Sequence, residues 1–137
     1  MKKAILILSI IAFTSNASAE EDTSEKKNFV TESDWKGVKC KKHYEDDGSS
    51  VQECVFTNAN LLQVYNIVKK IDPNLKNELP TKNLEYPSTK DGCISVDYQY
   101  KSKNHLYIEL SYNGGVTYVE IIENKNNTQS KITYSPD

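Results

Sequence analysis

The sequence predicts an α+β domain in which one amphipathic helix packs against an antiparallel sheet, with the element order ββαβββ(β). The sheet is expected to combine an N-terminal hairpin with a C-terminal meander of three to four strands. Three observations predict this fold. Two strand-like segments flank a run of turn formers, a central segment has apolar residues at helical spacing, and the C-terminal third alternates apolar and polar residues around an Asn-Gly-Gly turn.

The N-terminal hairpin is indicated by residues 35–44 and 50–56, which flank the turn formers Asp46, Asp47 and Gly48. Both arms are rich in residues that favour strands, and the segment between them consists of acidic and small residues. This pattern is typical of two antiparallel strands with a short connection.

Cys40 and Cys54 lie symmetrically about position 47, so a regular hairpin would place them opposite each other within bridging distance. In an oxidising compartment such a pair is expected to form a disulfide. Closing a loop of about 15 residues contributes roughly 3 kcal/mol to stability in the chain-entropy model. The alternative is a redox or metal-binding pair, which usually requires Cys-x-x-Cys spacing or further ligands nearby. We therefore predict a structural disulfide.

The helix is expected to span residues 59–71, with Asn58 as its N-cap and with Pro73, just after its last turn, preventing its continuation. Lys69 and Lys70 lie in its last turn, where the negative end of the helix dipole favours cations. Residues 72–91 contain three prolines among scattered polar residues and are predicted to form a long loop. The apolar residues at helical spacing are Leu61, Val64, Tyr65, Val68 and Ile71.

The C-terminal strands are predicted at residues 93–100, 105–112 and 116–122, and residues 131–134 are a candidate fourth strand. Asn113-Gly114 is a strong signal for a tight turn between the second and third of these. Such a turn would pair Leu110 with Thr117, Ile108 with Val119 and Leu106 with Ile121.

The first nineteen residues have the pattern of a secretory signal peptide: two lysines, an apolar stretch at 4–13, and the small residues Ala17-Ser18-Ala19. The apolar stretch is too short to cross a bilayer, which needs about 20 residues. We therefore predict a bacterial protein that is cleaved after Ala19 and then lies in the periplasm or the medium, without stable membrane insertion. The alternative is that the first nineteen residues remain as an uncleaved membrane anchor. Residues 20–34 are expected to form a flexible segment before a single domain at 35–137.

The charge of the mature chain argues against nucleic-acid binding. After cleavage the chain would keep fifteen lysines against nineteen acidic residues, a net charge of −4, and it contains no arginine. Arginine is the usual reader of phosphate groups and guanine edges, and nucleic-acid affinity depends on neutralising phosphates with cationic side chains. The sequence therefore favours a protein partner.

Cys93, His43 and His105 are the residues that invite a catalytic interpretation. Cys93 is left over if Cys40 pairs with Cys54; it is expected to be a buried free thiol, to pair with one of the other two cysteines instead, or to bond another chain. The two histidines have no local motif around them and are expected to lie on the surface. A catalytic thiol would need a base beside it, and neither histidine is close to Cys93 in sequence.

The acidic residues are not expected to form a metal site or an active site. The run Glu45-Asp46-Asp47 lacks the alternating acids and distal glutamate of a calcium-binding loop. Glu109 and Glu120 are predicted on the outer face of one hairpin, where both would remain ionised instead of acting as an acid–base pair. The sequence therefore predicts a protein that is not an enzyme and that uses no cofactor or metal.

The predicted outer face carries Tyr107 and Tyr118, and the chain contains nine tyrosines. Tyrosine is enriched in protein interfaces, although it is also an ordinary strand former. The predicted function is that of a small exported binding protein which occludes a protein partner, such as an immunity protein or an inhibitor of an envelope-acting toxin or cell-wall hydrolase. The alternative is a periplasmic accessory subunit of a pilus or secretion system. The residues expected to contact the partner are Glu45, Asp46, Asp47, Tyr107, Glu109, Tyr118 and Glu120.

Overall fold

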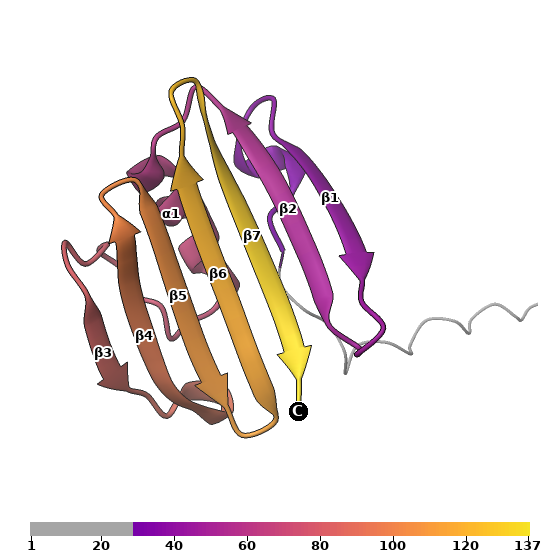
Figure 1. Cartoon of the computed structure of the whole chain (residues 1–137), viewed down its shortest axis with the longest axis vertical. Coiled ribbons are helices and arrows are strands. Elements are labelled where there is room, and N and C mark those ends of the chain that lie inside the picture. The colour runs from indigo at the N-terminus through magenta and orange to yellow at the C-terminus, as the bar shows by residue number, and fades with distance from the viewer. Residues whose placement is uncertain (1–28) are drawn as a thin grey trace, which may run out of the picture.

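The computed structural model describes residues 29–137, and the predicted signal peptide and residues 20–28 lie outside this part of the chain. One seven-stranded antiparallel sheet forms the described domain, with strand order β1-β2-β7-β6-β5-β4-β3. Helix α1 lies against one face of this sheet, behind the strands in Figure 1. The strands are β1 (Lys39–Tyr44), β2 (Ser50–Thr57), β3 (Leu84–Pro87), β4 (Cys93–Ser102), β5 (His105–Tyr112), β6 (Gly115–Glu123) and β7 (Asn127–Pro136). The helical segments are α1 (Leu61–Val68) and the short 3-10 helices η3 (Glu32–Asp34), η4 (Lys69–Ile71) and η5 (Lys90–Gly92). The predicted α+β class is confirmed.

Strand β7 joins the two parts of the sheet that the sequence predicts. It pairs with β2 on one side and with β6 on the other, so Ser130 lies opposite both Cys54 and Ile121. Residues 131–134 were expected as a candidate fourth strand, but β7 is ten residues long and begins at Asn127. The hairpin and the meander are therefore one continuous sheet.

The turn between β5 and β6 sets the predicted register. Leu110 pairs with Thr117, and the two further pairs expected from the Asn113-Gly114 turn are also present. Gly115 follows the turn with a φ of 148°, and a Cβ at this position would clash with the carbonyl oxygen of Ser135. A glycine is required here because the backbone of β7 passes very close.

The helix begins two residues later than predicted. Asn60, not Asn58, is the N-cap: its side chain accepts a hydrogen bond from the Gln63 backbone N–H at 2.8 Å, and the Gln63 side chain accepts from the Asn60 backbone N–H at 2.9 Å. This reciprocal arrangement is a capping box. Asn58 has a φ of 60°, a left-handed conformation that asparagine tolerates better than most residues. The regular α-helix ends at Val68 and continues as η4 to Ile71.

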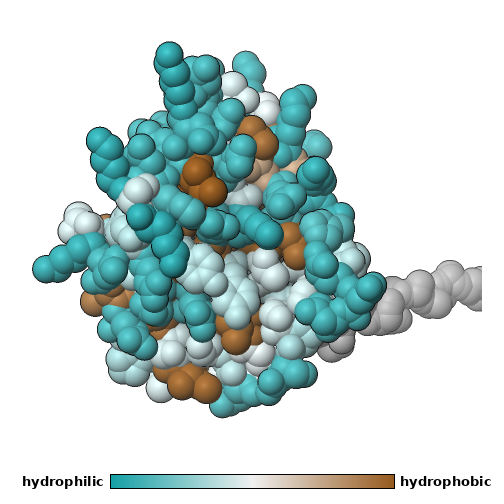
Figure 2. All heavy atoms as spheres, viewed as in Figure 1, coloured by the Kyte–Doolittle hydropathy of each residue, from teal (hydrophilic) through white to brown (hydrophobic). Residues whose placement is uncertain are grey.

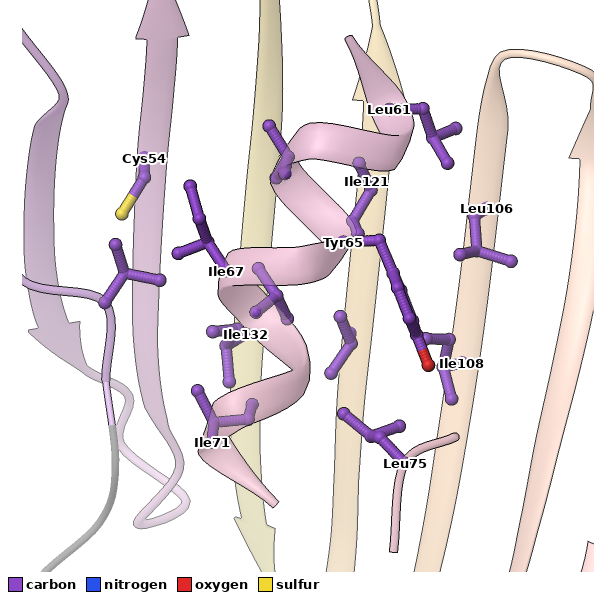
Figure 3. Packing of buried hydrophobic residues seen from close by; sticks show 14 of the residues in the cluster. Cys54, Leu61, Tyr65, Ile67, Ile71, Leu75, Leu106, Ile108, Ile121 and Ile132 are labelled. Carbon is purple, nitrogen blue, oxygen red and sulfur yellow. The ribbon is translucent and has the colours of Figure 1, made fainter. Parts of the chain in front are cut away.

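The core lies between α1 and the face of the sheet that it covers. In Figure 3, Tyr65 and Ile67 of the helix lie over side chains of the strands behind them. Ile108, Ile121 and Ile132 on those strands are fully buried. Burying an isoleucine side chain fully contributes about 1.5–3 kcal/mol, so these contacts are a main source of stability.

Residues 72–91 are not a simple loop, because they contain the edge strand β3 and the short helix η5. Tyrosine hydroxyl groups fix this segment to the domain. The Tyr98 hydroxyl lies 2.5 Å from that of Tyr65 and accepts from the Lys76 backbone N–H at 2.8 Å. Tyr86 and Tyr100 donate to backbone carbonyl oxygens in the segment at 2.6 Å. Much of the tyrosine content therefore has a structural role.

The described N-terminal residues pack on the domain. Val30 is buried, and its backbone N–H and C=O both bond the side-chain amide of Gln52, at 3.0 and 2.8 Å. Phe29 contacts Tyr134 edge to face, and the Trp35 indole donates to the Thr57 carbonyl oxygen at 3.0 Å. Phe29 and Val30, which were expected in the flexible segment, therefore pack against the rest of the described domain. None of the helices within residues 29–137 is long and apolar enough to cross a membrane.

Candidate functional site

The face of the sheet opposite α1 carries the candidate site, and we call it the open face. No described helix covers it, and it is turned toward the viewer in Figures 1 and 2. Figure 2 shows polar side chains over most of this face, apolar ones lying singly among them, and side chains of intermediate hydropathy toward the middle. Because side chains alternate along a strand, every second residue of each strand points to this face.

Tyr107 and Tyr118 form an aromatic pair near the middle of the open face. Their ring centroids are 5.9 Å apart with an interplanar angle of 29°. The register pairs Tyr107 with Glu120 and Tyr118 with Glu109, so four of the residues predicted to contact a partner lie side by side on β5 and β6. Partial burial, followed by the charges of the neighbouring groups, raises the pKa of Tyr107. Its hydroxyl therefore remains a neutral hydrogen-bonding group at physiological pH.

Glu120 also contacts a histidine that the sequence places on the surface. The His105 Nε2 atom lies 2.5 Å from the Glu120 carboxylate, and both side chains are about one-third exposed. His105 therefore orients Glu120 on the open face beside the tyrosine pair. The second histidine, His43, has a similar partner, because its Nε2 atom lies 2.8 Å from Glu45.

A shallow groove of about 510 Å³ crosses β1, β2, β7 and β6 on the open face. Val55 and Ile122 supply its apolar lining. A smaller hollow of about 200 Å³ beside the tyrosine pair shares the lining residues Glu120 and Lys131 with the groove, so the two depressions are neighbours. The polar side chains of the groove on this face are Lys39, Lys41, Glu53, Glu120, Gln129 and Lys131.

The charges on the open face are unevenly distributed across the strands. At one edge the register aligns Glu85 of β3, Asp97 of β4 and Glu109 of β5 in a single row. Like charges opposite each other on neighbouring strands are destabilising. Among residues 29–137, no ion pair involves any of these three carboxylates. At the other edge, β1 places Lys39 and Lys41 on the same face.

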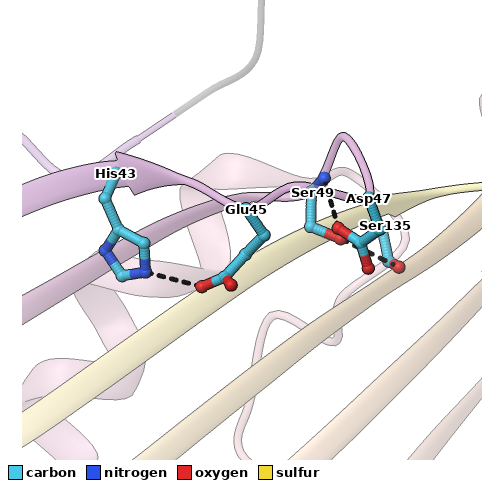
Figure 4. Close-up of polar contacts among 5 residues, drawn as sticks. All are labelled: His43, Glu45, Asp47, Ser49 and Ser135. Carbon is cyan, nitrogen blue, oxygen red and sulfur yellow. Dashed lines mark hydrogen bonds and ion pairs between the residues drawn. The ribbon is translucent and has the colours of Figure 1, made fainter.

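The acidic hairpin tip lies apart from the tyrosine pair. Figure 4 shows Glu45 held by His43, and Asp47 accepting a hydrogen bond from the Ser49 backbone N–H, which is 2.9 Å long and lowers the pKa of Asp47. The register places His43 three strand spacings from Tyr118, or roughly 14 Å. The structure therefore brings Tyr107, Glu109, Tyr118 and Glu120 together, but it leaves Glu45, Asp46 and Asp47 at one end of the sheet.

The cysteines have the predicted arrangement. Cys40 and Cys54 are directly paired between β1 and β2 and form a disulfide. Cys93 is a buried free thiol, the first of the three alternatives. Burial and then the nearby Asp72 carboxylate raise the pKa of the Cys93 thiol, which makes it less reactive as a nucleophile.

The groove across β1, β2, β7 and β6 is the part of the site that the sequence interpretation missed. Its lining residues Lys39, Lys41 and Val55 alternate along predicted strands, which is the only local signal for them. The contribution of Gln129 and Lys131 depends on β7 lying between β2 and β6, a long-range pairing that no local pattern indicates.

The fold and the site define a class: a small, disulfide-linked α+β domain with one helix-covered sheet face and one open, polar, tyrosine-bearing face. Within the described residues, no group of three or more His, Cys, Asp or Glu side chains is placed to hold a metal ion. No protein-family model matches the chain, and no curated protein is significantly similar to it in sequence.

Proposed function

We propose that this chain is an exported binding protein that acts by covering part of a protein partner with its open face. The partner class that we propose is a toxin acting in the bacterial envelope or a cell-wall hydrolase, for which the protein would be an immunity protein or an inhibitor. The observation that carries the proposal is the tyrosine pair Tyr107–Tyr118 near the middle of a sheet face that no described element covers.

The composition of the open face supports binding to a protein. Interfaces typically have an aromatic or apolar centre and a polar rim, and truncating a tyrosine at the centre often costs 2 kcal/mol or more. Here the tyrosine pair and Ile122 lie toward the middle with Glu109 and Glu120 beside the pair, and further charged side chains lie on the outer strands. Separate acidic and basic regions would steer a partner with complementary charges and fix its orientation.

The disulfide and the sequence of residues 1–19 support export. A disulfide in a domain of this size is typical of oxidising compartments. The signal-like pattern indicates the route by which the chain would reach one. A protein that must act outside the cytoplasm on another protein gains from such a linked scaffold, because a rigid surface loses little conformational entropy on binding.

The test is affinity capture from envelope extract with three forms of the protein. Wild type and Tyr44→Ala, a control with an exposed tyrosine on the covered side, should retain the same toxin or hydrolase. Tyr107→Ala/Tyr118→Ala should lose it, with affinity reduced roughly 30-fold or more. The captured enzyme should then be inhibited by the wild-type protein in a purified assay. Retention that is equal for all three forms, or no inhibition, would refute the proposal.

The accessory-subunit alternative relied on Cys93 and on the free edges of the sheet. Burial of Cys93 removes the first of these supports. The free edge of β1 remains, with all six of its residues exposed, and added strands commonly pair with such edges. Size-exclusion chromatography of the wild-type protein and of a variant with a proline on the exposed edge of β1 separates the two functions, because a multimer that the proline abolishes would favour the subunit.

A further inference from the structure

We infer that the free edge of strand β1 binds an extended segment of another protein, which adds to the seven-stranded sheet and carries acidic side chains at alternate positions. The added strand would run antiparallel to β1. This edge is separate from the tyrosine pair on the open face, and it would bind in the same way whether the protein is an inhibitor or an accessory subunit.

The two edges of the sheet differ in how well they are protected against strand addition. At the other edge, β3 has only four residues and ends in Pro87, and a short strand and a proline both discourage pairing. Strand β1 has six residues, contains no proline, and pairs with β2 without a register shift. Added strands commonly pair with an exposed edge of this kind. The β1 edge is therefore the one that is open to a partner.

The pairing with β2 determines which backbone groups of β1 face outward. The Cα atoms of Cys40 and Cys54 are 4.0 Å apart, a short separation typical of a pair that exchanges no backbone hydrogen bonds. The Glu45 backbone N–H bonds the Ser49 carbonyl oxygen at 2.8 Å, so the odd-numbered residues of β1 are the ones that bond to β2. The N–H and C=O groups of Cys40 and Lys42 therefore point away from β2. Among residues 29–137, no backbone hydrogen bond reaches these outward groups.

The disulfide holds this edge in place before a partner arrives. All six residues of β1 are exposed, so burial contributes little to keeping the strand on the sheet. The Cys40–Cys54 bond links the strand covalently to β2, at one of the residues whose backbone groups face outward. A strand that is already ordered loses little conformational entropy when it binds. The bond therefore prepares the edge for strand addition.

The charge of the edge selects an acidic partner. Residues 36–44 contain four lysines and no acidic residue. Lys39 and Lys41 lie on the same face of the strand, and among residues 29–137 neither forms an ion pair. In an added antiparallel strand, the two residues opposite these lysines are separated by one position. Acidic side chains at those two positions would face both cations, and opposite charges directly across two strands stabilise the pairing.

A second copy of β1 is a poor occupant of the same edge. Antiparallel pairing of two such edges matches even-numbered residues with even-numbered ones, because those residues carry the outward backbone groups. In the two registers with the greatest overlap, either Lys41 or Lys42 faces its own counterpart. Like charges opposite each other on neighbouring strands are destabilising. The edge therefore favours a different chain with acidic residues.

The test is binding of a capped synthetic peptide, TTVEVEVT, whose two glutamates can lie opposite Lys39 and Lys41. Calorimetry at low salt measures its affinity for the protein with the disulfide intact, and amide hydrogen exchange shows where it binds. The peptide should slow exchange at Cys40 and Lys42 more than at Lys41, which already bonds to β2. The matching lysine peptide, TTVKVKVT, should bind at least about tenfold more weakly.

Two sets of variants separate backbone pairing from charge. Lys42→Pro removes an outward N–H without removing a bond to β2, so it should abolish binding. The matched control Lys42→Ala removes the same charge but keeps the N–H, and it should bind nearly as well as wild type. Lys39→Glu/Lys41→Glu should reverse the preference and bind the lysine peptide, and this gain of binding also shows that the variant is folded.

A glutamate peptide that leaves exchange at Cys40 and Lys42 unchanged would overturn the inference, as would equal binding of the two peptides. Self-association of the wild type that Lys42→Pro abolishes would assign the edge to a second copy and would overturn it as well. Tyr107→Ala/Tyr118→Ala should bind the peptide like wild type. Failure at the edge and failure of the proposed function of the open face are therefore distinguishable.

Discussion

Removing the disulfide should lower the free energy of unfolding by about 3 kcal/mol. Cys40 and Cys54 are 14 positions apart, and the chain-entropy model gives this value for a loop of about 15 residues. The Cys54 side chain is only 1% exposed, so Cys40→Ala/Cys54→Ala also removes some buried contacts and should be slightly less stable than the reduced wild type. Urea denaturation of the oxidised, reduced and double-alanine forms measures all three values.

The location of the disulfide adds a second readout. Strand β1 is at the edge of the sheet and pairs only with β2, so its amide hydrogens should lose protection from exchange more than those of β6. Reductant should have no effect on the double-alanine variant, because Cys93 is free. If the reduced and oxidised proteins unfolded at the same urea concentration, the assignment of the disulfide as a stabilising link would be wrong.

Two further predictions concern the helix cap and the buried tyrosines. Asn60→Ala should lower the free energy of unfolding by about 1 kcal/mol because it removes the N-cap. Asn58→Gly should be neutral or slightly stabilising because Asn58 has a positive φ, which glycine adopts without strain. Thermal unfolding compares the two variants, and the opposite order of stability would contradict the observed cap. Burial raises the pKa of Tyr65 to about 12, from an ordinary value near 10, so its neutral form is favoured in the folded protein. The corresponding stability is present below pH 10 and should be lost as pH rises through 10 to 12, which urea denaturation across this range would show. A phenolate absorbance titration with no group ionising above the ordinary tyrosine range would contradict it.

Local patterns predicted those parts of the fold that short-range geometry determines. The Asn113-Gly114 turn fixes the register of β5 and β6, and this register places Tyr107 and Tyr118 together on one face. The symmetric cysteines likewise identify the first hairpin, because a disulfide requires the two residues to be opposite each other.

The full length of β7 was hidden because its buried positions are not hydrophobic. Thr128 and Ser130 point into the core but are polar, so the strand shows no apolar alternation before Ile132. The Thr128 hydroxyl donates to the Ala59 carbonyl oxygen at 2.6 Å, a bond that depends on the tertiary structure. Sequence patterns therefore found only residues 131–134 of this strand and missed the groove that its first half completes.

Strand β3 was missed for a different reason. It has only four residues, ends in Pro87 and lies at an edge, where three of its four positions are exposed. Its pairing with β4 follows from tyrosine hydroxyl bonds that hold the preceding segment in place, such as that of Tyr100 to Pro80. No periodic signal is expected from a strand stabilised in this way.

The location of β7 also determines when the sheet can be completed. It is the last strand of the described chain, and it separates β2 from β6 in the finished sheet. Until it inserts, the domain consists of a two-stranded ribbon and a four-stranded unit whose inner edges both have unpaired backbone groups. Assembly of the whole sheet must therefore wait for the ten residues of β7, and a chain truncated before Asn127 would have two halves with no strand between them.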